Sequence, residues 1–157
     1  MTTFAERSHP GVHLDAALEL LLQTVGDPWD SMEQSLRDIP PGGLGAARTE
    51  ASAAWHLWHA CSVFRYHATL VIGDSRAAEW PPSPTQDASA EEVQAALKAD
   101  VHRFVAWARA NAETFAAMTI PHGQDRSPIE MLGVMSRHIV WHAAAVYYRA
   151  RPRPANA

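Results

Sequence analysis

Cysteine and lysine are almost absent from this sequence, and each scarcity excludes a class of protein. The single cysteine, Cys61, cannot form a disulfide within the chain, which is typical of proteins from a reducing compartment. Lysine occurs only at Lys98, and the formal net charge is −4. Affinity for a nucleic-acid backbone depends on positive charge, so we expect no nucleic-acid partner.

Long apolar runs are also missing. No apolar stretch approaches the roughly 18 residues that a membrane span needs, so we expect no membrane partner. The first residues show no basic region followed by an apolar run, so we expect no signal peptide. Together with the lone cysteine, these features predict a cytoplasmic protein.

The composition that remains is that of a helical globular domain. The chain has 157 residues, 47% hydrophobic and 19% charged, which predicts one domain over residues 1–157 with loose ends at 1–10 and 150–157. Alanine is abundant, whereas valine, isoleucine and threonine are sparse, and this favours helix over sheet.

Apolar residues recur at helical spacing in four long stretches, residues 12–25, 49–72, 90–118 and 128–149. A short helical continuation is expected over 29–37. Four long amphipathic helices predict an all-α, four-helix bundle. In the second helix we expect Tyr66 to face the core.

The boundaries of these helices carry their own signals. Gly73 is expected to stop the second helix. Ser89 with Glu92, and Ser127 with Glu130, have the spacing of capping boxes at the starts of the third and fourth helices. The connections 38–47 and 74–88 are rich in helix breakers. The second is long for a bundle, so it is expected to cross the bundle or to cover a site, with Trp80 as a packing anchor or a pocket wall.

Two histidines in the last helix, His138 and His142, stand four residues apart. On a helix this spacing places them on one face, with about 6 Å of rise between them, so both imidazoles can reach one metal ion. A metal site needs at least a third ligand. Alternatively, one histidine faces water and the other is hydrogen-bonded in the core.

The second helix offers two candidates for that third ligand. His56 and His59 are three residues apart, inside the bulky segment Trp55-His56-Leu57-Trp58-His59, and either could complete the site. His67 lies about 16 Å beyond His56 along the helix, so these two cannot share an ion. Three imidazoles with an open position suit Zn²⁺ or Ni²⁺ best, with Fe²⁺ or Mn²⁺ as further candidates.

The other histidines and the cysteine are weaker candidates. His102 is expected at the solvent boundary, His122 in a turn, and His9 and His13 on the surface. Cys61 lies about 140° round the helix from His56, and we interpret it as a small core residue.

Two segments together resemble a known family. Ala54-Trp55-His56-Leu57 in the second helix, combined with His138-Ile139-Val140-Trp141-His142 in the last, is similar to the DinB-like family. Its superfamily includes metal-containing, thiol-dependent S-transferases and mycothiol-dependent maleylpyruvate isomerases. The likeness extends over most of the chain, because the helix order and the long connection after the second helix also agree.

The resemblance implies a fold and a ligand set. It implies an up-down-down-up bundle, often dimeric, that binds a divalent metal through His56, His138 and His142. His59 would then be a neighbour that lines the pocket. One departure stands out: the family often has glycine and a polar residue after the last histidine, where this chain has Ala143-Ala144-Ala145. Metal binding is expected to survive this departure, but the missing polar group removes a side chain that could tune the metal.

Three hypotheses for function follow. The first is a metal-dependent transferase or hydrolase acting on a small molecule, with a water or a low-molecular-weight thiol bound at the open position, in which His59, Arg65, Trp80 or Arg149 contributes to the pocket. The second is a non-catalytic metal- or ligand-binding bundle in a stress response. The third is a bundle without metal, whose histidines are satisfied by hydrogen bonds.

Overall fold

A computed structural model of the chain describes residues 10–27, 31–37, 39, 44 and 52–151. Helix accounts for 75% of these described residues, which confirms the all-α expectation. The described residues form α1 (Pro10–Gly26), α2 (Met32–Arg37), α3 (Ala53–Ile72), α4 (Asp74–Ala77), α5 (Ala90–Ala110), α6 (Ala112–Ala116) and α7 (Pro128–Ala150), with a hairpin of β1 (Ile120–His122) and β2 (Gln124–Arg126). Among the described helices, none is both long and apolar enough to cross a bilayer.

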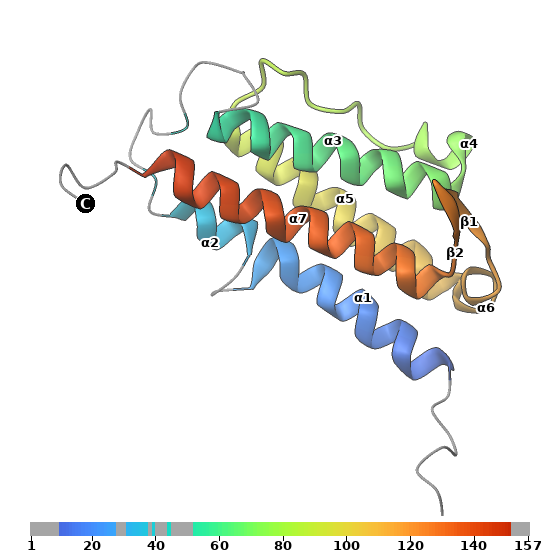
Figure 1. Ribbon diagram of the computed structural model, residues 1–157. Helices are drawn as coiled ribbons and strands as arrows, with labels where there is room; N and C mark the ends of the chain where they lie inside the picture. The colour runs from blue at the N-terminus through green and yellow to red at the C-terminus, as the bar shows by residue number, and fades with distance from the viewer. Residues whose placement is uncertain (1–9, 28–30, 38, 40–43, 45–51, 152–157) are drawn as a thin grey trace, which may run out of the picture.

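The four long helices lie side by side (Figure 1). Both α3 and α1 pack against α7 and against α5. Following the colours along the chain, α1 and α7 run in one direction and α3 and α5 in the other. The seam between α3 and α7 is the most extensive of these contacts, and it brings together the two helices that carry the candidate metal ligands.

The helix ends follow the expected local chemistry. Both capping boxes are present. The Ser89 hydroxyl accepts a hydrogen bond from Glu92 N–H, and the Ser127 hydroxyl accepts one from Glu130 N–H. In each box the glutamate carboxylate accepts a hydrogen bond from the backbone N–H of the serine. Gly73 ends α3 at φ 85°, a conformation that side chains disfavour, and its N–H donates to Thr69 O. The expected start of this helix near residue 49 lies outside the described residues, and Ser52 is the observed N-cap.

The core is apolar and continuous between the helices. In α3 it is formed by Leu57, Cys61, Phe64 and Ala68, each no more than 1% exposed. Tyr66 is 58% exposed, so the expectation that it faces the core was wrong. Around the axis of α3, Tyr66 lies 200° from Phe64, and Phe64 is the residue that packs edge to face on Phe104 of α5.

The third predicted helix is interrupted. It was expected to run to residue 118, but α5 ends at Ala110, and the backbone of Asn111 leaves the helical region at φ −120° and ψ 30°. After α6, the chain forms the β1–β2 hairpin, with Gly123 at φ 70° in its turn and His122 paired with Gln124. The hairpin packs on α3 and was not predicted.

The connection between α4 and α5 crosses the outside of α3 (Figure 1). Arg65 of α3 donates hydrogen bonds to Pro81 O at 2.6 Å and to Ser83 Oγ at 2.9 Å. The Trp58 indole donates to Pro84 O at 3.2 Å. Trp80 packs against the core and lies 5.8 Å from the Arg65 guanidinium, so it is a packing anchor for this connection.

Candidate metal centre

Four histidines from two helices meet in the α3–α7 seam. His56 and His59 lie one turn apart on α3, and His138 and His142 lie one turn apart on α7. Because the helices run antiparallel and in contact, the two pairs face each other. The spacing of the sequence therefore produces a cluster of imidazoles rather than two separate pairs.

Three of these histidines are arranged as a metal could require. One ring nitrogen from each of His59, His138 and His142 lies within 4.8 Å of the others. The ring centroids are 4.5 Å apart for His138 and His142, and 4.9 Å apart for His59 and His142. His142 is 1% exposed, while the other two are half-buried.

This grouping differs in one member from the set that the resemblance implied. His59, expected as a pocket neighbour, takes the place expected for His56. His56 is nevertheless close, with its Nδ1 2.9 Å from Nδ1 of His142. The structure therefore brings together both candidates for the third ligand.

Several nitrogens in this cluster are buried without a hydrogen-bond partner. They are Nε2 of His56, Nε2 of His138 and Nε2 of His142. An unpartnered buried polar atom destabilises the fold by about 1–3 kcal/mol, and such atoms are uncommon in native proteins. A cation bound by the ring nitrogens would give some of them a partner, so the donor set fits a borderline divalent metal.

Burial favours the neutral form of His56, His138 and His142, because it lowers the pKa of each of them. It lowers the pKa of His142 to about 3, with further lowering from His138, His59 and His56. Burial, followed by the charge of Arg149, also lowers the pKa of His56, and burial lowers the pKa of His138. A neutral imidazole has a free lone pair, which is the form that binds a metal.

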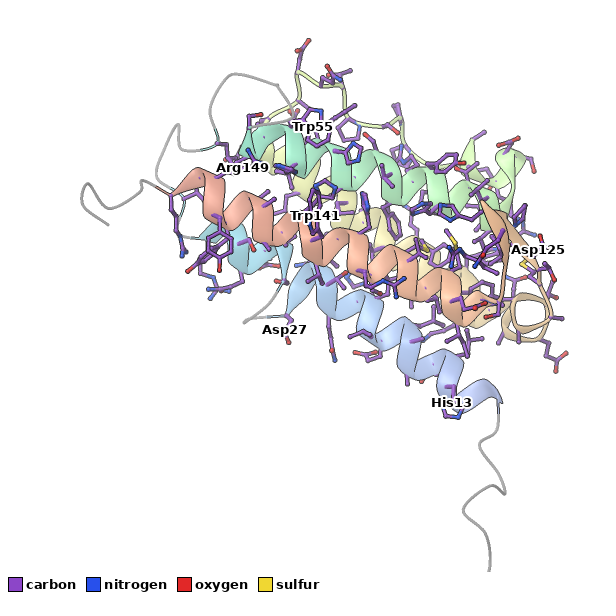
Figure 2. The ribbon with its side chains drawn as sticks, viewed as in Figure 1. His13, Asp27, Trp55, Asp125, Trp141 and Arg149 are labelled. Carbon is purple, nitrogen blue, oxygen red and sulfur yellow. The ribbon has the colours of Figure 1, made fainter. Side chains whose placement is uncertain are left out.

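Two tryptophans border the cluster. Trp55 stacks on His59 with the ring centroids 4.3 Å apart, and Trp141 lies edge-on to His142 at 4.6 Å. Figure 2 shows Trp55 on α3 and Trp141 on α7, on the same side of the molecule. Trp141 is 61% exposed, and together with His138 it lines a shallow groove of about 710 Å³. The two aromatic rings therefore flank the cluster, Trp55 from α3 and Trp141 from α7.

The remaining expected pocket residues have different positions. The Arg65 guanidinium donates hydrogen bonds to Asp100, Pro81 and Ser83. These bonds hold the connection that also contains Trp80. Arg149 is exposed near the start of α3 (Figure 2), and its charge acts on His56.

The alanines that follow His142 offer no polar group. Ala143 is buried, Ala144 is exposed and Ala145 is half-buried. The hydrogen-bonding group that the family often has at this point is therefore missing from this part of α7.

The histidines that were expected at the surface, and Cys61, do not belong to the cluster. His13 and His102 are exposed, and His9 lies outside the described residues. Cys61 is 1% exposed, and burial raises its pKa to about 12, so it is an inert core residue, as expected.

A second histidine contact was missed in the sequence. His67 of α3, 4% exposed, has its Nε2 3.0 Å from Nε2 of His122 in the hairpin. No sequence signal paired them, because they are 55 residues apart and the hairpin was not predicted.

A scan against protein-family models, a search of curated proteins and a search of solved structures found no match to this chain.

Proposed function

We propose that the chain is a divalent-metal-binding protein of the DinB-like type, with its metal held in the α3–α7 seam. The observation that carries the proposal is the convergence of His59, His138 and His142, whose nitrogens lie within 4.8 Å of one another. The unpartnered Nε2 atoms of His138 and His142 support it, because a cation gives such atoms a partner.

The fold we propose is a four-helix bundle of up-down-down-up topology, made of α1, α3, α5 and α7. The directions of these helices in Figure 1 support this topology, as does their packing, in which α1 and α3 each contact both α5 and α7. The segment from residue 73 to residue 89, which includes α4, links α3 and α5. These two helices run in the same direction, so the segment has to travel the length of the bundle.

Zn²⁺ or Ni²⁺ is the proposed metal, with Fe²⁺ and Mn²⁺ as weaker candidates. A donor set of imidazoles alone suits these ions better than Mg²⁺ or Ca²⁺, which prefer oxygen ligands. When bound, such an ion supplies a Lewis acid that lowers the pKa of a water or a thiol in its open position.

The proposed activity is a thiol-dependent transfer or a hydrolysis on a small molecule. The exposed ring of Trp141 and the adjacent groove provide a surface for an apolar part of the substrate. The positive charge of Arg149 near His56 suits an anionic group of the substrate.

A low-molecular-weight thiol is the proposed co-substrate, and the cytoplasm is the proposed location. A homodimer is also proposed, since Trp141 and Tyr148 leave apolar surface exposed on α7.

One contact favours a second candidate function, a metal-binding protein without turnover. His56 Nδ1 lies 2.9 Å from His142 Nδ1, so a fourth imidazole is at hand to close the coordination sphere. Structural zinc sites have four protein ligands, whereas catalytic sites keep one position open.

Titration of the Co²⁺-loaded protein with a small thiol distinguishes these two functions. An open site predicts a thiolate-to-cobalt charge-transfer band that saturates with added thiol. The His56→Ala variant serves as the matched comparison, since removing a fourth ligand opens the position. A band that appears only in this variant contradicts the enzyme and supports the closed site.

A further inference from the structure

We propose that His56 is a positioning residue for the metal centre, which fixes the tautomer of His142 so that the Nε2 lone pair of His142 is free for the metal. The inference rests on the metal-binding function proposed above and deepens its form with an open coordination position. His56 then orients a ligand without binding the metal, and the ligands are His59, His138 and His142.

His56 contacts one member of this group of three histidines. Its Nδ1 lies 2.9 Å from Nδ1 of His142, and the two ring centroids are 5.1 Å apart. The nitrogens that lie within 4.8 Å of one another come from His59, His138 and His142, and this group does not include His56. His56 is therefore placed beside one ligand rather than among all three.

The contact between the two rings decides which nitrogen of His142 remains for a metal. A neutral imidazole carries one proton, so in a hydrogen bond between the two Nδ1 atoms one ring donates and the other accepts. If His142 donates, its Nε2 keeps a free lone pair, and His56 carries its own proton on Nε2. If His56 donates, the proton of His142 lies on Nε2 and blocks that atom. Only the first arrangement makes His142 a ligand through Nε2.

A bound metal favours the first arrangement. Nε2 of His56 and Nε2 of His142 are both buried without a partner, so in metal-free protein either tautomer leaves both atoms unsatisfied. A cation at Nε2 of His142 leaves only the Nε2–H of His56 unsatisfied, which lowers the cost of burial. His56 then supplies the acceptor that a carboxylate or a backbone carbonyl supplies in most histidine metal sites.

Packing holds the ring of His56 in place for this role. His56 is 3% exposed, and the rings of Trp55 and Trp141 lie nearly perpendicular to it, at 81° and 75°. Figure 2 shows these two tryptophans, one on α3 and one on α7. A side chain confined by packing can orient its neighbour, because its own rotamer is already fixed.

The zinc affinity of three variants at His56 tests the positioning role. The amide oxygen of asparagine is attached to Cγ, as Nδ1 of histidine is, so His56→Asn can still accept the bond from His142. His56→Gln carries the same amide one atom further out, and His56→Ala has no acceptor. In whole, untagged protein we expect the affinity for Zn²⁺ to fall about 10–100-fold in His56→Gln and His56→Ala and to stay near that of wild-type protein in His56→Asn. An equal loss in all three variants, or no loss in any, overturns the positioning role.

Nitrogen NMR of the zinc-loaded wild-type protein tests the same role without any variant. Long-range proton–nitrogen correlation spectra show which nitrogen of each ring carries a proton and which binds zinc. We expect a proton on Nδ1 of His142 and on Nε2 of His56, with no nitrogen of His56 bound to zinc. Zinc on His56, or a proton on Nε2 of His142, overturns the positioning role and leaves the metal-binding function standing. Wild-type protein that binds no zinc overturns both.

Discussion

The carboxylate of Asp100 offers the sharpest prediction about stability. It is fully buried in α5, where its Oδ2 accepts from Arg65 Nε at 2.9 Å and its Oδ1 from Arg103 Nη1 at 2.9 Å. Burial raises the pKa of Asp100, and the hydrogen bonds from the two arginines offset only part of this. Through Arg65, the same carboxylate positions the connection at Pro81 and Ser83.

Asp100→Asn removes the charge but keeps the shape of the side chain. Breaking a buried ion pair by changing one partner destabilises a protein by about 3–5 kcal/mol, because the remaining charge is left unpaired. The Arg65 side chain is only 14% exposed, so water compensates little, but its bonds to the connection remain. We therefore expect a loss near the lower end, about 3 kcal/mol. Asp100→Leu combined with Arg65→Met should recover most of it, since no buried charge then remains.

Urea unfolding at neutral pH, followed by circular dichroism, measures this loss. Asp15→Asn is the matched control, since Asp15 pairs with Arg109 at 3.0 Å but is 67% exposed. Exposed pairs contribute about 1 kcal/mol or less. A loss for Asp100→Asn that is no larger than for Asp15→Asn would show that the buried pair does not hold this part of the fold.

Three further predictions follow from the same contacts. The metal-free protein should lose stability as the pH falls, because the pKa of His142 is about 3 and that of His67 about 4 in the folded state, against 6.5 as the ordinary value. As the pH falls, the unfolded chain therefore takes up protons before the folded protein does. Each of these two histidines is expected to lower the free energy of unfolding by on the order of 2 kcal/mol between about pH 6.5 and pH 5, measured by urea unfolding. An unchanged urea midpoint over this pH range would refute this prediction. Cys61 should react with a thiol reagent only after unfolding, since it is buried with a pKa of about 12; rapid labelling of the native protein would contradict its place in the core. Ser127→Ala removes the N-cap of α7 and should lower the free energy of unfolding by about 1 kcal/mol, with an unaltered urea midpoint as the contrary result.

Local chemistry in the sequence predicted three of the helix ends correctly. The capping boxes at Ser89 and Ser127 and the stop at Gly73 depend only on residues within one turn, and all three are present. The phase of α3 was harder to predict. This helix has apolar or aromatic residues on nearly every side, so periodicity alone could not show that Phe64 faces inward while Tyr66 faces solvent.

The hairpin and the contacts it makes could not be predicted from patterns. Strands of three residues are too short to show alternation, and Pro121 argues against a strand except at an edge. The contact of His67 with His122 depends on this hairpin, so it was missed as well.

The candidate metal cluster was predicted in part. The i, i+4 spacing identified His138 and His142, and the spacing on α3 left His56 and His59 as alternatives. The resemblance favoured His56, whereas the structure groups His59 with the other two and keeps His56 in contact with His142. Choosing between neighbours on one helix requires the rotation of that helix about its axis, which tertiary packing determines.

The metal content of untagged protein tests the central claim most directly. Elemental analysis after exposure to Zn²⁺ or Ni²⁺ should compare wild-type protein with the His138→Ala, His142→Ala double variant. His102→Ala, at an exposed position, is the control for the loss of a histidine alone. We predict one metal ion per chain fewer in the double variant than in wild-type protein and the control. Equal metal content in all three proteins, or none in any of them, would contradict a metal site in the α3–α7 seam.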